Sequence, residues 1–309
     1  MVQLKNTSIL VVGGTGFIGY HLAKKSLTKG WQVTSISSNP PRKIRYLSKV
    51  KYIICDVTKK NILKKNIKKS FDYVVNLSGY VDHSNKKKTY KSHYLGCKNL
   101  TDIFLKKVPK AFVQIGSCIE YGNLKSPQKE NNNFNLKLIK TVYGKAKLSA
   151  SKHLLNLFKK NNFPSIILRL YLAYGPKQDM NRFLPIIIDG CIKNKKFPCS
   201  IGNQLRDFVH VDDVVDAIIK SLKNKNAKGQ IINIGSGKPR KIKDIINHVK
   251  KISKGGFPQF GKIKLRKDEI LKLYPSIKKA KKKIDWKPKI SFEKGLQSTI
   301  KYYYEQSKK

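Results

Sequence analysis

The chain has 309 residues, 40% of them hydrophobic, and its 66 Lys and Arg residues against 18 Asp and Glu residues give a formal net charge of +48. This length and composition fit an ordinary globular protein of one large domain or two smaller ones. No uninterrupted apolar segment is long enough to span a bilayer, and no charged-then-apolar leader precedes the first strand. We therefore expect a cytoplasmic protein with no membrane partner.

The cysteines and the positive charge both bear on the function. Five cysteines, an odd number without a Cys-x-x-Cys pair, argue against a disulfide framework and a zinc site, so we expect reduced thiols and no metal. The charge would attract polyanions, which makes a nucleic-acid-binding protein on a dinucleotide-binding fold the hypothesis from another class. Only seven of the 66 cationic residues are arginines, and the lysines are spread over nearly every surface segment. This is typical of a solvated surface and makes nucleic acid the less favoured partner.

The chain opens with a strand-to-helix junction that contains three glycines. Residues 9–12 form a run of buried-strand type, and an amphipathic helix follows over 17–30. Gly13 allows a tight turn, Gly16 lets the backbone approach a pyrophosphate, and Gly19 permits close packing of helix on strand. The helix amides then face the phosphates. The junction predicts a dinucleotide-binding turn, and a glycine-rich turn of some other α/β protein is the alternative.

Apolar runs and helix-compatible stretches then alternate along the chain. Further strands are expected at 32–36, 52–55, 73–77, 111–117 and 165–171, and the helices at 90–107 and 141–160 are long enough for right-handed crossovers. This alternation predicts an α/β fold, a doubly wound parallel sheet of Rossmann type.

Two segments within this alternation carry groups suited to acid-base chemistry. Ser117 ends the strand at 111–117, on the edge where parallel sheets hold their ligands, although a strand-end serine is often only a turn or cap residue. Tyr143 and Lys147 are four residues apart, so a helix would place them on one face. A neighbouring ammonium would lower the pKa of a phenol toward useful pH, whereas an exposed surface pair is the alternative.

The alternation loosens after residue 175, where Pro and Gly residues separate shorter elements. We therefore expect an NAD(P)-binding Rossmann domain over 1–175 and a smaller, interleaved C-terminal substrate domain over 176–309. Acidic residues followed by an apolar stripe predict a helix that ends at Leu222. This helix belongs to the segment 206–236, which we expect to pack back on the first domain.

Taken together, these motifs resemble the extended short-chain dehydrogenases/reductases that act on nucleotide sugars, the NAD(P)-dependent epimerase/dehydratase family. The resemblance covers nearly the whole chain. It rests on GGTGFIG (13–19), Asp56, NLSG (76–79), YGKAK (143–147), RLYLAYGP (169–176), GNQLRDFVHVDD (202–213), NIGSG (233–237) and WKP (286–288).

The resemblance implies a role for each candidate residue. Tyr143 would be the general acid-base, Lys147 would lower its pKa and bind the nicotinamide ribose, and Ser117 would orient the sugar oxygen. Arginine forks suit a diphosphate, and Arg206 and Arg266 match the family positions that grip it, although Arg266 can also be a surface charge. The residues expected to contact the cofactor are Gly13, Gly16, Phe17, Ile18, Gly19, Ser37, Arg42, Asp56, Val57 and Lys147.

The end of the second strand bears on the choice of cofactor. NAD-specific members usually carry an acid there, but this chain has Ser37, followed by cations that include Arg42 and Arg45. A hydroxyl beside cations suits a 2′-phosphate, so the sequence favours NADP(H), with NAD(H) possible and an ordinary basic loop as the alternative.

Departures from the family pattern narrow the reaction. Cys118 and Ile119 stand where the dehydratase branch has an Asp-Glu pair, and Glu120 lies one position too late, so dehydration is disfavoured. Cys118 is expected to be a packed thiol. Leu172 replaces a frequent Asn, which puts one family contact to the sugar or diphosphate in doubt.

An NADPH-dependent 4-ketoreductase of a 4-keto-6-deoxy sugar, similar to the CDP-abequose/paratose synthases, is therefore favoured. An NAD-dependent C4 epimerase of a UDP-sugar is the alternative. The family habit also implies a homodimer through the helices at 90–107 and 141–160.

Overall fold

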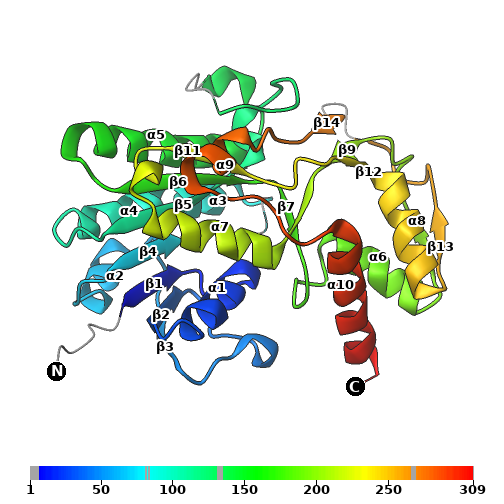
Figure 1. Cartoon of the computed structure of the whole chain (residues 1–309), viewed down its shortest axis with the longest axis horizontal. Coiled ribbons are helices and arrows are strands. Elements are labelled where there is room, and N and C mark those ends of the chain that lie inside the picture. The colour runs from blue at the N-terminus through cyan, green and yellow to red at the C-terminus, as the bar shows by residue number, and fades with distance from the viewer. Residues whose placement is uncertain (1–6, 81, 83, 131–134, 266–268, 309) are drawn as a thin grey trace.

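Seven parallel strands form the central sheet of the protein, for which the computed structural model describes residues 7–80, 82, 84–130, 135–265 and 269–308 (Figure 1). The strand order reverses between β1 and β4, so a crevice is expected beyond the carboxyl ends of these two strands. In their order across the sheet, the strands are β11 (Ile231–Ile234), β6 (Ser165–Leu170), β5 (Ala111–Ser117), β4 (Tyr73–Asn76), β1 (Ser8–Val12), β2 (Gln32–Ser37) and β3 (Val50–Ile54).

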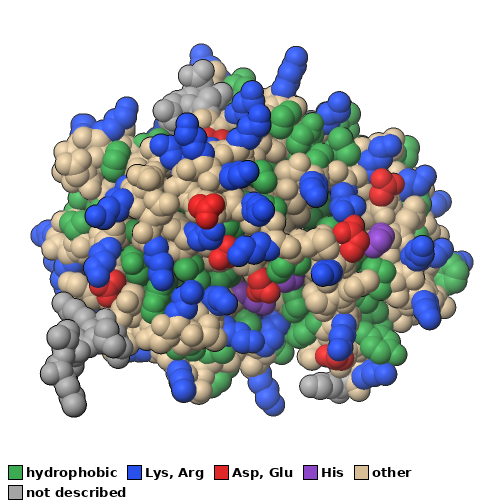
Figure 2. All heavy atoms as spheres, viewed as in Figure 1, with side chains coloured by type: hydrophobic (Ala, Val, Ile, Leu, Met, Phe, Trp, Pro, Cys, Tyr) green, Lys and Arg blue, Asp and Glu red, His purple; other side chains and the backbone are tan. Residues whose placement is uncertain are grey.

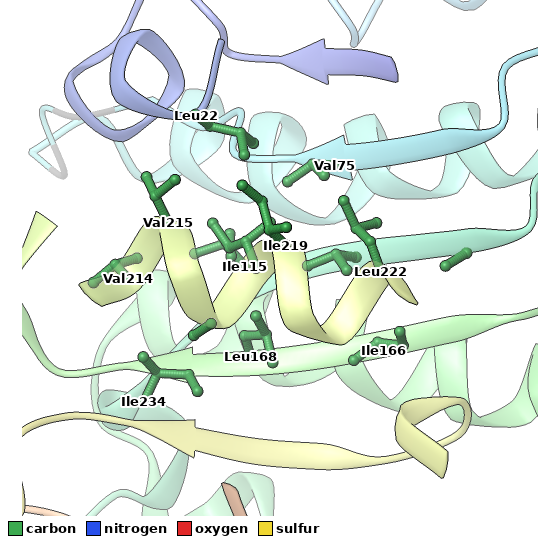
Figure 3. Packing of buried hydrophobic residues seen from close by; sticks show 14 of the residues in the cluster. Leu22, Val75, Ile115, Ile166, Leu168, Val214, Val215, Ile219, Leu222 and Ile234 are labelled. Carbon is green, nitrogen blue, oxygen red and sulfur yellow. The ribbon is translucent and has the colours of Figure 1, made fainter. Parts of the chain in front are cut away.

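Helices cover both faces of this sheet. On one face, α1 (Phe17–Leu27) and α7 (Val211–Lys223) pack side by side, and Figure 3 shows Val215 and Ile219 of α7 among side chains of α1 and the sheet. On the other face, apolar residues of α2 (Lys60–Asn66), α4 (Gly96–Phe104) and α5 (Val142–Asn161) share a second core. These two cores explain why the strands are apolar on both sides.

A third core lies outside the sheet, on the right of Figure 1. It is built mainly by α6 (Phe183–Ile192), α8 (Ile242–Ser253) and α10 (Phe292–Ser307). The short strands form two pairs and one three-stranded sheet. Helix α9 (Lys278–Ile284) contacts β11. The short strands are β7 (Leu172–Tyr174), β8 (Lys196–Pro198), β9 (Leu205–Arg206), β10 (Phe208–His210), β12 (Arg240–Lys241), β13 (Phe257–Gln259) and β14 (Lys272–Leu273).

The predicted fold class is confirmed, and each predicted strand of the sheet matches an observed one to within about two residues at its ends. β11 pairs with β6, and α7 packs on the sheet. The domain boundaries at 1–175 and 176–309 stay a prediction.

One predicted helix is wrong in its form. The continuous helix expected over 90–107 consists of α3 (Lys86–Tyr90), a π-helical turn (Lys91–Leu95) and α4, and it begins at the capping residue Asn85. Residues of this turn contact the loop after β4, where the Ser92 hydroxyl accepts from the Tyr80 N–H at 2.9 Å, and a local pattern does not encode such a contact. Among the described residues, no helix is both long and apolar enough to cross a bilayer.

Candidate active site

The glycine turn between β1 and α1 has the close contacts that its sequence predicts. Gly13 has a φ of +82°, its N–H donates to the Ile36 carbonyl at 2.7 Å, and a Cβ there would lie 3.0 Å from the Leu77 backbone. A Cβ on Gly19 would collide with the Gly13 carbonyl oxygen. Gly16 caps α1, so the first amides of the helix face outward from the turn. This cradle fits the pyrophosphate of a dinucleotide.

Phe17 and Ile18 form the first turn of α1 and are both partly buried. They therefore lie next to the cradle, and their contact with a cofactor stays a prediction.

The cations after β2 are already paired in this structure. Ser37 is buried, and its Oγ accepts a hydrogen bond from the Thr15 N–H at 3.2 Å. The Arg42 guanidinium is largely exposed and lies 3.0 Å from a carboxylate oxygen of Asp179, which also accepts from Arg45 at 2.9 Å. Asp179 thus competes with any 2′-phosphate for these two arginines.

The loop after β3 is fixed from a neighbouring helix. Asp56 accepts a hydrogen bond from the Thr58 N–H at 2.8 Å. Val57 is buried, and its carbonyl accepts from the Asn99 amide of α4 at 2.9 Å. A Cβ on Gly96 would lie 2.6 Å from the Val57 side chain. The sequence had not singled out Asn99 or Gly96 as supports for this loop.

The three predicted catalytic residues come together at the carboxyl end of β5. Ser117 ends that strand, and Thr141 caps α5 by accepting from the Gly144 N–H at 3.1 Å, which sets Tyr143 in the first turn. Lys147 is one turn further along, and its Nζ lies 5.9 Å from the centre of the Tyr143 ring. Its ammonium donates to the Ile115 carbonyl at 2.7 Å.

Burial dominates the ionisation of this pair. It raises the pKa of Tyr143 to about 12, against the opposing effect of a hydrogen bond with the Ser117 side chain. It also lowers the pKa of Lys147 to about 8, against the attraction of Glu120. The pKa of the Tyr143 phenol therefore lies above its ordinary value, whereas its spacing from Lys147 predicts a lowering toward neutral pH.

Glu120 supports the site through hydrogen bonds of both its carboxylate oxygens. One of its carboxylate oxygens accepts from the Ser117 N–H at 2.7 Å, and the other accepts from the Ser151 hydroxyl at 2.7 Å and from Arg169 Nε at 3.0 Å. The Glu120 side chain is fully buried and that of Arg169 is 2% exposed. The carboxylate is thus held by structural partners.

Apolar contacts surround the next position along the chain. Cys118 packs with Tyr171 and Leu273, and burial raises the pKa of its thiol to about 12. A neutral, packed thiol fits the expectation from the sequence.

The arginine predicted to bind a diphosphate forms an internal ion pair. Arg206 lies on β9, between β12 and β14, and its guanidinium pairs with the carboxylate of Glu269 while also donating to the Leu205 carbonyl at 2.9 Å. The other predicted arginine, Arg266, lies outside the residues that the structure describes. Leu172 is 38% exposed at the start of β7.

The structure adds one buried residue beside Tyr143 that the sequence analysis missed. His93, on the π-helical turn, places its ring edge against the Tyr143 ring with the centroids 4.9 Å apart. The contact joins two separate helices, so spacing along the chain gives no signal for it.

Comparisons with known proteins agree with this geometry. The model of the NAD dependent epimerase/dehydratase family matches residues 9–235. A putative UDP-glucose 4-epimerase of Methanocaldococcus jannaschii is 28% identical over 307 residues, which are 95% of this chain and 97% of that protein. A CDP-abequose synthase of Salmonella muenchen is 24% identical over 96% of this chain and 97% of its own length.

The fold is also similar to that of a solved structure. The UDP-glucuronic acid 4-epimerase of Bacillus cereus, in complex with UDP-glucuronic acid and NAD, superposes with a TM-score of 0.87 at 25% identity. The match covers 97% of this chain and all of that one. Fold, glycine turn and family match all agree, and the chain belongs to the NAD dependent epimerase/dehydratase family of enzymes, the extended short-chain dehydrogenases/reductases.

Proposed function

We propose that this enzyme reduces the ketone of a nucleotide-activated 4-keto-6-deoxy sugar with NADPH. The observation that carries the proposal is the meeting of Ser117, Tyr143 and Lys147 at the carboxyl end of β5, in the same sheet edge as the glycine turn. The similarity to a CDP-abequose synthase over nearly the whole chain supports this choice within the family.

The chemistry follows from the ionisation of these residues. NADPH, when bound, would supply the hydride. The Tyr143 hydroxyl, which is neutral at physiological pH because its pKa is about 12, donates the proton that the C4 oxygen needs. Ser117 orients that oxygen by a hydrogen bond. Lys147 would bind the nicotinamide ribose. When protonated, it would also stabilise the phenolate that Tyr143 becomes after it has donated its proton.

The residues that follow Ser117 argue against elimination of water. Cys118 is a neutral thiol in an apolar cluster, and Ile119 has no acid-base group. The carboxylate of Glu120 is occupied by Ser117, Ser151 and Arg169. No described residue directly after Ser117 is therefore available as the acid or base of a dehydratase.

The preference for NADPH rests on the end of β2. At the end of β2, the hydroxyl of Ser37 replaces the acid that would bind a ribose 2′-hydroxyl. Arg42 follows five residues later, and its exposed side chain can exchange Asp179 for a 2′-phosphate. We expect a lower KM for NADPH than for NADH. Arg42→Ala should raise the KM for NADPH and leave that for NADH nearly unchanged, whereas an equal effect on both would contradict this preference.

Arg206, with Arg266, is the proposed grip on the substrate diphosphate. A homodimer through the helices α3 to α5 is the proposed assembly, and a sedimentation mass of one chain would contradict it.

The test of the reaction is an assay of NADPH oxidation with a nucleotide 4-keto-6-deoxy sugar. Tyr143→Phe should lower kcat by about 10²- to 10⁴-fold, since it removes the proton donor and keeps the ring. Tyr304→Phe, at an exposed position of α10, is the matched control. Turnover that survives in Tyr143→Phe would contradict the assignment.

The alternative is a C4 epimerase, which the similarity to a putative UDP-glucose 4-epimerase favours. Incubation with UDP-glucose and no added cofactor separates the two. Interconversion of the C4 epimers would replace the reductase proposal with this one.

A further inference from the structure

The π-helical turn between α3 and α4 brings a histidine to the catalytic tyrosine. His93 lies within this turn (Lys91–Leu95) and is buried, with 6% of its surface exposed. Its ring meets the Tyr143 ring edge-on, at an interplanar angle of 75°. Such edge contacts are favourable and orient one ring against the other.

The same histidine is anchored on its other side by the loop after β4. His93 Nε2 lies 3.2 Å from the Tyr80 carbonyl oxygen, and the ring covers Gly79 so closely that a Cβ there would overlap it. Ser92, the preceding residue, accepts a hydrogen bond from the Tyr80 N–H at 2.9 Å. Two consecutive residues of the π turn thus hold both polar groups of the Tyr80 backbone.

Both contacts come from the π turn, Lys91–Leu95. π-Helical turns are rare and are frequently found at functional sites. In this chain the π turn lies beside the Tyr143 phenol, between the loop after β4 and the first turn of α5.

We propose that His93 is a positioning residue for Tyr143: its ring, fixed by Gly79 and the Tyr80 carbonyl, holds the phenol in the orientation that proton transfer requires. This inference rests on the proposed function, in which Tyr143 donates the proton. A small displacement of a reacting group costs a large factor in rate because the reacting atoms must be aligned, so the ring contact affects kcat more than binding.

Two substitutions test the ring contact. His93→Ala removes the ring and should lower kcat by about 10- to 100-fold while KM stays within about twofold. His93→Phe keeps a planar ring against Tyr143 but loses the bond to the Tyr80 carbonyl, so it should recover only part of the lost kcat. The matched control is His153→Ala on α5, because His153 bonds the Thr101 hydroxyl at 2.8 Å and packs on Tyr94 rather than Tyr143.

A second readout does not depend on turnover. In protein with ¹³C at the tyrosine Cζ, the Tyr143 resonance is identified by its loss in Tyr143→Phe. His93→Ala should shift this resonance, while His153→Ala should leave it in place. A His93→Ala protein with unchanged kcat and an unchanged resonance would overturn the positioning role. If the wild-type enzyme reduces no 4-keto sugar but the resonance shifts, the proposed reaction fails and the positioning role stands.

Discussion

Lys147 shows at the scale of one residue how burial and chemistry are linked. Burial lowers the pKa of its ammonium from 10.5 to about 8, although the Ile115 carbonyl accepts one of its protons. The Lys147 amine therefore binds its proton more weakly in the folded chain than in the unfolded chain. This difference predicts that the contribution of Lys147 to the free energy of unfolding depends on pH.

The sign of that dependence follows from proton counting. Between pH 8 and pH 10.5 the unfolded chain retains a proton on Lys147 that the folded chain releases, so the contribution of Lys147 to the free energy of unfolding rises with pH. The difference between wild type and Lys147→Met should increase by up to about 3 kcal/mol across this window. Urea unfolding at several pH values measures it, and parallel curves for the two proteins would contradict it.

The ion pair of Arg206 with Glu269 keeps its guanidinium in place, with 10% of the side chain exposed. Arg206→Ala should raise the KM for the nucleotide sugar at least about tenfold, because charged hydrogen bonds are strong, and leave NADPH affinity unchanged. Lys193→Ala, which removes an exposed partner of Asp189, is the control. An unchanged KM would exclude Arg206 from the diphosphate site.

Single residues differ in how far the sequence predicts them. The spacing of Tyr143 and Lys147 places both on one face of α5, since a helix repeats every 3.6 residues. The ion pairs of Arg42 with Asp179 and of Arg206 with Glu269 join distant parts of the chain. No local pattern specifies such partners, so they appear only in the folded molecule.

At the scale of elements, a buried ion pair joins the turn after β5 to β6. Glu120 lies in that turn and Arg169 on β6, and their charged groups are 3.0 Å apart with almost no exposure. Removing one partner of a buried pair leaves the other charge uncompensated. This network therefore fixes the turn that carries Ser117.

The predicted cost can be compared with that of an exposed pair. Glu120→Gln should lower the free energy of unfolding by about 3 kcal/mol. Glu293→Gln breaks a pair with Arg240 that is 38–47% exposed, and should cost no more than about 1 kcal/mol. Chemical denaturation of both variants measures the difference, and equal losses would contradict a structural role for Glu120.

The sequence predicts the strands of the sheet well, and it predicts the helix over 90–107 without its π turn. Apolar runs bounded by glycines and polar residues located the sheet strands because buried parallel strands are apolar on both faces. The helix over 90–107 was predicted without its π turn, because the contacts of Ser92 and His93 with Tyr80 are tertiary.

At the scale of the whole molecule, the positive charge is dispersed over the face that Figure 2 shows. Lys and Arg side chains lie across this entire face, with no single cluster over one element. Cations dispersed in this way attract polyanions weakly at many places.

This distribution predicts salt-sensitive, nonspecific contacts with nucleic acid. RNA retained at low salt should be released by ~0.2 M salt, because each lysine contact releases counterions independently. A filter-binding series measures the midpoint. Tight retention above that salt concentration would revive the polyanion-binding hypothesis.

The proposed reaction is a net transfer of hydride to the sugar C4 position, which an isotope label on the nicotinamide can follow. The enzyme is incubated with a nucleotide 4-keto-6-deoxy sugar and NADPH in which both hydrogens at the nicotinamide C4 are deuterium, and the product is analysed by mass and NMR. We predict one deuterium at the sugar C4 for each NADPH oxidised, and loss of this product in Tyr143→Phe. Product formed without deuterium at C4, or no oxidation of NADPH, would contradict the proposed reaction.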